Sequence, residues 1–173
     1  MYNRCRSLGA FALAGAFLAG AFAPTPAVAA DRLEFELATL NGGEFVKLDD
    51  FVNRAILINV WGTDCPPCVK ETPLLNAQSQ IYTNVQFLGI GTDDRISSLR
   101  FANRFHVRYP ELRVPQDPGG LLRRLGDSDG ALPFTVVLDT QHRICASHLG
   151  AVDEEWIADA VHRCSAPHAE AVP

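Results

Sequence analysis

The chain has 173 residues, of which 47% are hydrophobic, and a formal net charge of −5 at pH 7. This acidic balance opposes binding to nucleic acid or to anionic membrane surfaces, so we expect neither as a partner. The length is that of a single domain with a hydrophobic core of its own.

The N-terminus carries the pattern of a secretory signal peptide. Arg4 and Arg6 precede an apolar stretch from Leu8 to Ala23, and small residues suited to a signal peptidase follow at 27–30. The apolar stretch is shorter than the about 20 residues that a membrane span prefers, so an uncleaved anchor is the weaker alternative. The pattern indicates export to the periplasm, where disulfides persist. The predicted organisation is a signal segment, one domain and a disordered tail, at residues 1–30, 31–166 and 167–173.

The first predicted elements of the domain are a hairpin, a buried strand and a helix. Leu33–Leu37 and Glu44–Leu48 alternate around Asn41-Gly42-Gly43, which predicts a β-hairpin. Ala55–Trp61 is a continuous apolar run, typical of a strand buried on both faces. A helix is expected from Cys65 to Tyr82.

The remaining pattern completes an α/β layout. Pro73 lies inside the first predicted helix and predicts a kink there. After this helix we expect a strand parallel to the first at 85–91, a helix at 94–106 and an irregular connection at 108–120. One helical turn at 121–125, a hairpin of two strands at 134–139 and 143–149, and a last helix at 153–164 are expected to follow. This order predicts one central mixed sheet flanked by helices.

The motif Cys65-Pro66-Pro67-Cys68 carries the clearest chemistry. Two cysteines three apart, where a buried strand passes into a helix, indicate a redox dithiol in a βαβ context. At a helix start, unpaired N–H groups and the helix dipole favour the thiolate of Cys65. A structural disulfide and half of a zinc site are the alternatives. Because the sequence offers no second pair of zinc ligands at suitable spacing, we expect no metal.

Cys145 and Cys164 form a second candidate pair. A helix from 153 to 164 that returns antiparallel over its strand covers about 16 Å. The strand from Cys145 to its end covers about 13 Å. These lengths bring the helix end beside the strand start, so we expect a structural disulfide there. Two separately buried free thiols are the alternative.

The sequence around the dithiol resembles a known family. Residues 59–73 read N-V-W-G-T-D-C-P-P-C-V-K-E-T-P, and residues 132–139 read L-P-F-T-V-V-L-D. Both segments are similar to exported thioredoxin-fold thiol–disulfide oxidoreductases of the TlpA/ResA type, which are DsbE-like. Besides the cysteines, the offsets that match are those of Trp61, Glu71, Pro73 and Pro133. The resemblance implies a thioredoxin-like fold, with the predicted hairpin as an N-terminal extension.

The resemblance also implies catalytic roles. Cys65 would attack a target disulfide as a thiolate, and Cys68 would then resolve the mixed disulfide. Glu71 lies at the third residue after Cys68, on the same helix face, and a buried carboxyl there would relay the proton of Cys68. An exposed Glu71 paired with Lys70 is the alternative.

Target binding is expected at the second matching segment. The resemblance implies that Pro133 is cis and lies against the dithiol. The backbone of Leu132 would then hydrogen-bond an extended segment of the target, with Trp61 as a further binding residue.

These features predict an exported disulfide reductase that needs no cofactor. Asp64 departs from the family, which often has Trp there, and its charge opposes the thiolate of Cys65, which favours a reductant. The expected partners are disulfide-bearing proteins, as in cytochrome c maturation or reduction of copper-site cysteines, and a membrane thiol electron donor. The chain itself is expected to be a monomer. A copper chaperone that uses the dithiol as soft ligands is the alternative function.

Overall fold

The computed structural model describes residues 32–114 and 118–166. The predicted signal segment at 1–30 and the predicted tail at 167–173 lie outside these ranges. The described residues form seven strands, one 3₁₀ helix and four α-helices: β1 (Glu36–Ala38), β2 (Phe45–Lys47), η1 (Leu48–Phe51), β3 (Ile56–Trp61), α1 (Pro66–Ile81), β4 (Gln86–Gly91), α2 (Arg95–Arg104), β5 (Glu111–Arg113), α3 (Pro118–Leu125), β6 (Phe134–Leu138), β7 (Ile144–Leu149) and α4 (Glu154–Cys164).

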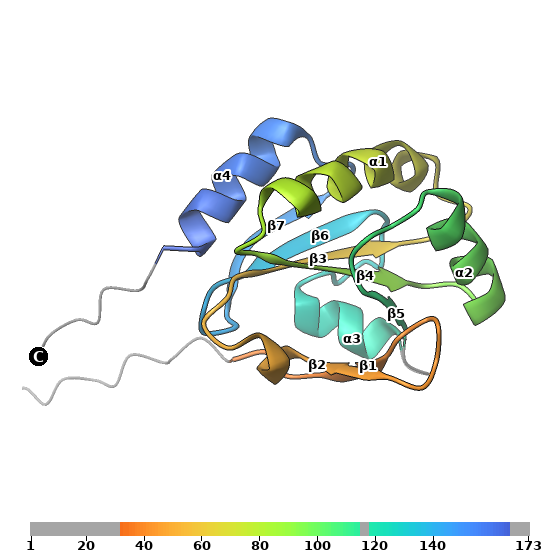
Figure 1. The fold of residues 1–173 in the computed structure, drawn as a ribbon, viewed down its shortest axis with the longest axis horizontal. Coiled ribbons are helices and arrows are strands. Elements are labelled where there is room, and N and C mark those ends of the chain that lie inside the picture. Colours follow the sequence, from red (N-terminus) through yellow and green to blue (C-terminus); the bar gives the residue numbers. More distant parts are fainter. Residues whose placement is uncertain (1–31, 115–117, 167–173) are drawn as a thin grey trace, which may run out of the picture.

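The predicted mixed sheet flanked by helices is confirmed. Five strands lie in the order β5-β4-β3-β6-β7. β4 is parallel to β3 and β5 is parallel to β4, whereas β6 is antiparallel to β3 and β7 is antiparallel to β6. Helices α1 and α4 lie over one face of this sheet, and α3 lies with the β1–β2 hairpin on the other side (Figure 1).

The central strand β3 explains why the sheet is covered on both faces. All six of its residues are buried. Ile56, Ile58 and Val60 belong to the core cluster that includes α3, whereas Leu57 belongs to the cluster that includes α4. Each buried side chain of this size contributes about 1.5–3 kcal/mol relative to exposure. Asn59 is the polar exception, and strand alternation places it on the same face as Leu57.

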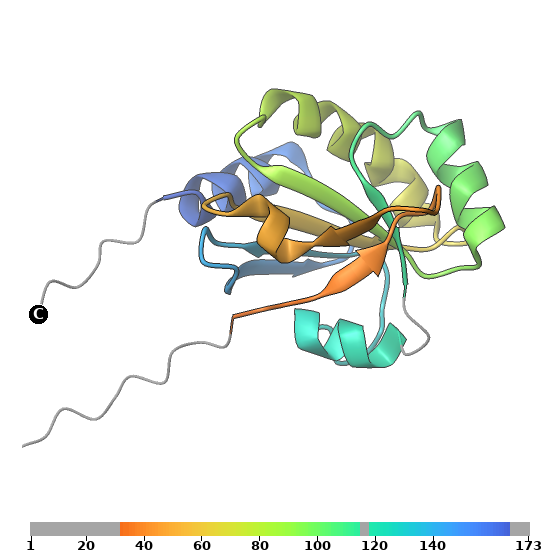
Figure 2. The same cartoon turned by 60° about the horizontal axis from the view of Figure 1, so that its bottom comes forward.

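The predicted N-terminal hairpin is confirmed, with shorter strands than expected. β1 pairs antiparallel with β2, with Leu37 opposite Val46, and the turn residues Gly42 and Gly43 have positive φ. The hairpin forms a separate two-stranded sheet. It reaches the edge of the main sheet, where the N–H of Leu40 donates to the carbonyl of Glu111 at 2.8 Å. Figure 2 shows it running toward β5, so it shields an edge strand that would otherwise be open.

One part of the predicted layout is wrong. The segment 108–120 was expected to be irregular, but it contains β5 and the start of α3. A strand of three residues behind Pro110 is too short to show a periodic pattern, and its place is set by pairing with β4. Helix α3 begins at Pro118 and runs through Gly119 and Gly120, and glycine is a poor helix former, so the sequence indicated only its second half.

The last helix lies antiparallel to β7 and is covalently joined to it. Asp153 caps the helix by accepting a hydrogen bond from the N–H of Trp156 at 2.8 Å. At the far end Cys164 forms a disulfide with Cys145, with the two Cα atoms 5.8 Å apart. The bond joins the second residue of β7 to the last residue of α4 and closes a loop with a sequence separation of 19.

We expect the double substitution Cys145→Ala with Cys164→Ala to lower the free energy of unfolding by about 2–4 kcal/mol, since the crosslink restricts the unfolded chain. Urea unfolding of both proteins, with the Cys65–Cys68 pair oxidised in each, measures the difference. An unchanged unfolding midpoint would contradict this role.

Candidate functional site

The two cysteines of the motif lie at the N-terminus of α1. Cys65 is the N-cap residue, and its Sγ accepts a hydrogen bond from the N–H of Cys68 at 3.3 Å. Pro66 and Pro67 occupy the first two helical positions, where no N–H donor is needed. The two sulfurs are joined, with the Cα atoms 5.2 Å apart. Cys68 is fully buried, whereas Cys65 is half-buried, so Cys65 is the sulfur that a partner can approach.

An aromatic cluster lies beside the pair. Trp61, the last residue of β3, packs with Cys68 and Phe101 in one buried cluster, which Leu132 joins from the side. The rings of Trp61 and Phe101 are stacked, with centroids 4.3 Å apart. Trp61 is only 2% exposed, so it is part of this core and offers little surface to a partner.

The turn before β6 reaches the same cluster. The peptide bond between Leu132 and Pro133 is cis. The side chain of Leu132 lies against the loop before the dithiol, because a Cβ added to Gly62 would be 3.2 Å from its Cδ1. The carbonyl of Pro133 accepts a hydrogen bond from Gly150 N at 2.8 Å. Within the described ranges, no hydrogen bond engages the N–H or carbonyl of Leu132.

Glu71 lies inside the protein, one turn after Cys68. Its side chain is 3% exposed, which excludes the alternative of a solvent-exposed glutamate. Its Oε1 accepts from Nδ2 of Asn59 at 2.9 Å, and its Oε2 accepts from the N–H of Val152 at 3.0 Å. Asn59 also donates to Oγ1 of Thr135 at 3.0 Å. Burial raises the pKa of Glu71, and the hydrogen bonds from Val152 and Asn59 act in the opposite direction.

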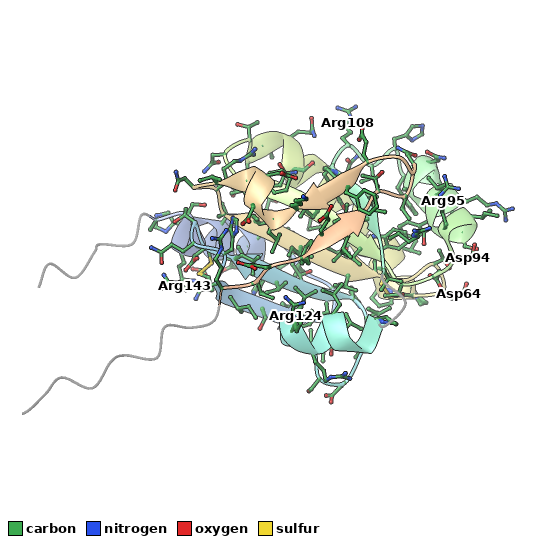
Figure 3. The ribbon with its side chains drawn as sticks, turned by 90° about the horizontal axis from the view of Figure 1, so that it is seen from below. Asp64, Asp94, Arg95, Arg108, Arg124 and Arg143 are labelled. Atoms are coloured by element: carbon green, nitrogen blue, oxygen red, sulfur yellow. A yellow bond between two sulfur atoms is a disulfide. The ribbon has the colours of Figure 1, made fainter. Side chains whose placement is uncertain are left out.

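The loop that leads into the dithiol is fixed by residues that the sequence analysis did not single out. Asp93, in the connection after β4, accepts a hydrogen bond from the N–H of Thr63 at 2.6 Å. Thr92 donates through both its N–H and its hydroxyl to the carbonyl of Trp61, at 2.9 and 3.1 Å. Asp64 is exposed and lies at the same end of the molecule as Asp94 (Figure 3). The loop that ends at Cys65 therefore carries one exposed acid, Asp64, and is held by a second, Asp93.

A second carboxyl near the dithiol cluster, that of the half-buried Glu111, was also missed. Glu111 of β5 accepts a hydrogen bond from Nε1 of Trp61 at 2.8 Å. Burial raises the pKa of Glu111 to about 8, with the Trp61 hydrogen bond acting in the opposite direction. Because Glu111 falls in the segment read as irregular, no periodic pattern linked it to the dithiol.

The fold and a cysteine pair at a helix start, with one half-buried sulfur, define a thioredoxin-like redox protein, and comparison with known proteins agrees. Residues 19–162 match the Redoxin family model, and the chain belongs to this family. It is 30% identical over 134 residues to the thiol-disulfide oxidoreductase ResA of Geobacillus thermodenitrificans, covering 76% of this chain and 74% of that protein. It is 30% identical over 145 residues to the thiol:disulfide interchange protein DsbE of Pseudomonas fluorescens, covering 83% of this chain and 79% of that protein.

Solved structures support the fold. A thioredoxin-family thiol:disulfide interchange protein from Chlorobium tepidum superposes with a TM-score of 0.68 at 18% identity, covering 78% of this chain and 95% of that one. Together these findings confirm the expected thioredoxin-like fold and the expected class, a thiol–disulfide oxidoreductase.

Within 32–114 and 118–166 no helix is both long and apolar enough to cross a membrane. The same ranges contain no group of three or more histidine, cysteine or acidic residues arranged to hold a metal ion.

Proposed function

We propose that the chain is an exported protein-disulfide reductase that passes two electrons from the Cys65–Cys68 dithiol to a disulfide in a target protein. The observation that carries this proposal is the difference in burial between the two cysteines: Cys65 is half-buried at the helix N-terminus, and Cys68 is fully buried behind it. Such a pair suits an attacking thiol and a resolving thiol.

The first step is attack by Cys65. Its Sγ lies where the N–H of Cys68 and the positive end of the α1 dipole favour a thiolate. The thiolate attacks one sulfur of the target disulfide, the target S–S bond breaks, and the leaving sulfur takes up a proton. A mixed disulfide between Cys65 and the target remains.

The second step is release of the target by Cys68, and we propose that Glu71 takes part. The thiol of Cys68 must lose its proton before its sulfur attacks Cys65, and water has little access to this buried group. Glu71 is the buried carboxyl one helical turn away, with a pKa raised by burial. It accepts the proton, Cys68 displaces the target sulfur, and the protein's own disulfide forms.

Target recognition is proposed at Leu132. Its backbone N–H and carbonyl are unpaired within the described residues, and its side chain packs in the same cluster as both cysteines. An extended segment of the target can add to this position by strand-type hydrogen bonds. Recognition of this kind uses the target's main chain, so it tolerates many sequences around the target disulfide.

The direction of electron flow follows from charge. A thiolate at Cys65 must form next to Asp64 and near Asp93, whose carboxylate holds the preceding loop through Thr63. These negative charges oppose the stabilisation that the helix N-terminus gives the thiolate, which weakens the reduced form and makes the couple a better donor of electrons. A membrane thiol donor would restore the dithiol, and the monomeric chain would act in the periplasm.

Trapping tests the order of attack. We expect Cys68→Ala to accumulate a covalent mixed disulfide with an oxidised model protein, because the target can no longer be displaced from Cys65. Non-reducing electrophoresis and mass spectrometry measure the adduct. The matched control is Cys65→Ala, which should form none. If Cys65→Ala forms the adduct through Cys68, and Cys68→Ala forms none, the assignment of Cys65 as the attacking thiol is wrong.

Stopped-flow kinetics tests the role of Glu71. We expect Glu71→Gln to slow release of the mixed disulfide roughly 10²-fold at neutral pH, because the proton acceptor is gone, and to leave the first step unchanged. Glu155→Gln, an exposed acid of α4, is the matched control for loss of charge. If folded Glu71→Gln releases its target at the wild-type rate, the relay proposal is wrong.

A further inference from the structure

A row of four residues crosses the sheet under α1. In the strand register Glu111 is beside Gly89, Gly89 is beside Asn59, and Asn59 is beside Thr135. Neighbours in register share a face of the sheet. Glu71 hydrogen-bonds to Asn59 in this row, so a buried carboxyl and a half-buried one lie over the same layer of the sheet.

Two glycines of β4 make room, one for the carboxyl of Glu111 and one for the indole of Trp61 and the side chain of Ser98. A Cβ added to Gly89 would lie 2.2 Å from Oε2 of Glu111, and a Cβ added to Gly91 would lie 3.2 Å from Cη2 of Trp61. The carboxyl and the indole therefore lie directly on the backbone of β4. Glycine in a strand interior is the residue that permits such close approach.

Trp61 links Glu111 to the dithiol. Its Nε1 donates to Oε2 of Glu111 at 2.8 Å, one face of its ring stacks on Phe101, and it packs in one cluster with Cys68. A buried indole N–H needs an acceptor, and in this structure Glu111 supplies it. Glu111 is thus hydrogen-bonded to a ring that lies in the same buried cluster as Cys68.

We propose that Glu111 is a positioning residue of the dithiol, which sets the reduction equilibrium of Cys65 and Cys68 by fixing Trp61 in the cluster that buries Cys68. The inference rests on the proposed function, since it concerns the same redox couple. Reduction converts the Cys65–Cys68 disulfide into two thiol groups, using two electrons and two protons from an external pair of thiols, which becomes a disulfide. A fixed indole excludes water from Cys68, so its loss would let water stabilise the reduced form and make the protein a weaker reductant.

The charge of Glu111 adds a dependence on pH. Burial raises its pKa to about 8 in the oxidised structure, so the group is mostly protonated at neutral pH. The titratable neighbours are Tyr109 and His106, which line a pocket of about 170 Å³ with Glu111. Burial raises the pKa of Tyr109, and the charges of Glu111 and Glu71 raise it further. Since a thiolate disfavours a nearby carboxylate, reduction should draw an extra proton onto Glu111 above about pH 8.

The test compares Glu111→Leu and Glu111→Gln with the parent protein, all carrying Trp156→Phe so that fluorescence reports Trp61 alone. Each is equilibrated against a thiol redox buffer from about pH 6 to about pH 9.5. At the lowest pH, Glu111→Gln should keep the parent equilibrium constant and Trp61 emission, because its amide oxygen still accepts the indole N–H. It should lose the added pH dependence above about pH 8. Glu111→Leu should favour the reduced form by about threefold or more at every pH and change the emission of Trp61.

Controls separate this inference from the proposed function. Glu36→Gln removes an exposed acid and should match the parent throughout. Parent-like equilibrium constants in Glu111→Leu would overturn the inference even if Trp61 emission changes, because Glu111 would then be merely structural. If Glu111→Leu does not fold, the inference is overturned when the equilibrium constant of Glu111→Gln depends on pH as it does in the parent. A parent protein without a reversible couple would instead overturn the proposed function.

Discussion

The hydrogen bond between Glu71 and Asn59 is the interaction on which the site depends. It joins α1 to the central strand β3 inside the core, and the second oxygen of Glu71 ties the same helix to Val152 before α4. Burying a carboxylate costs free energy unless its oxygens accept hydrogen bonds. Helix α1 is therefore held at the position where both oxygens of Glu71 find a donor. That position sets the N-terminus of α1, and with it Cys65 and Cys68, at the end of β3.

The same constraint explains why the two cysteines differ in burial and therefore in role. Because Glu71 anchors the helix face that carries Cys68, this sulfur is buried, while Cys65 at the helix start stays within reach of a partner. The surrounding loops fix the approach: Asp93 holds Thr63, and Leu132 packs from the opposite side. The disulfide between Cys145 and Cys164 secures α4, whose preceding loop supplies the second donor to Glu71. The structural disulfide thus helps to hold the helix arrangement that the redox cysteines require.

Much of this arrangement could be predicted from the sequence, because it rests on local signals. The apolar run of β3, the glycines of the hairpin and the spacing of the cysteine motif each indicate their structure directly. β5 and Glu111 could not be predicted, since a three-residue strand is specified by its neighbour β4 rather than by its own pattern. Asn59 was visible only as part of a motif, because its partners Glu71 and Thr135 are brought to it by the fold.

The equilibrium reduction potential of the Cys65–Cys68 pair is the most direct test of the account. Acidic residues around Cys65 and the buried Cys68 predict a reductant, with a potential of about −250 mV or lower, near the thioredoxin end of the range. Equilibration with a thiol redox buffer at neutral pH measures it. A potential near about −120 mV would contradict the account and assign the protein as a dithiol oxidase. The absence of any reversible couple would favour the alternative of a copper-binding module.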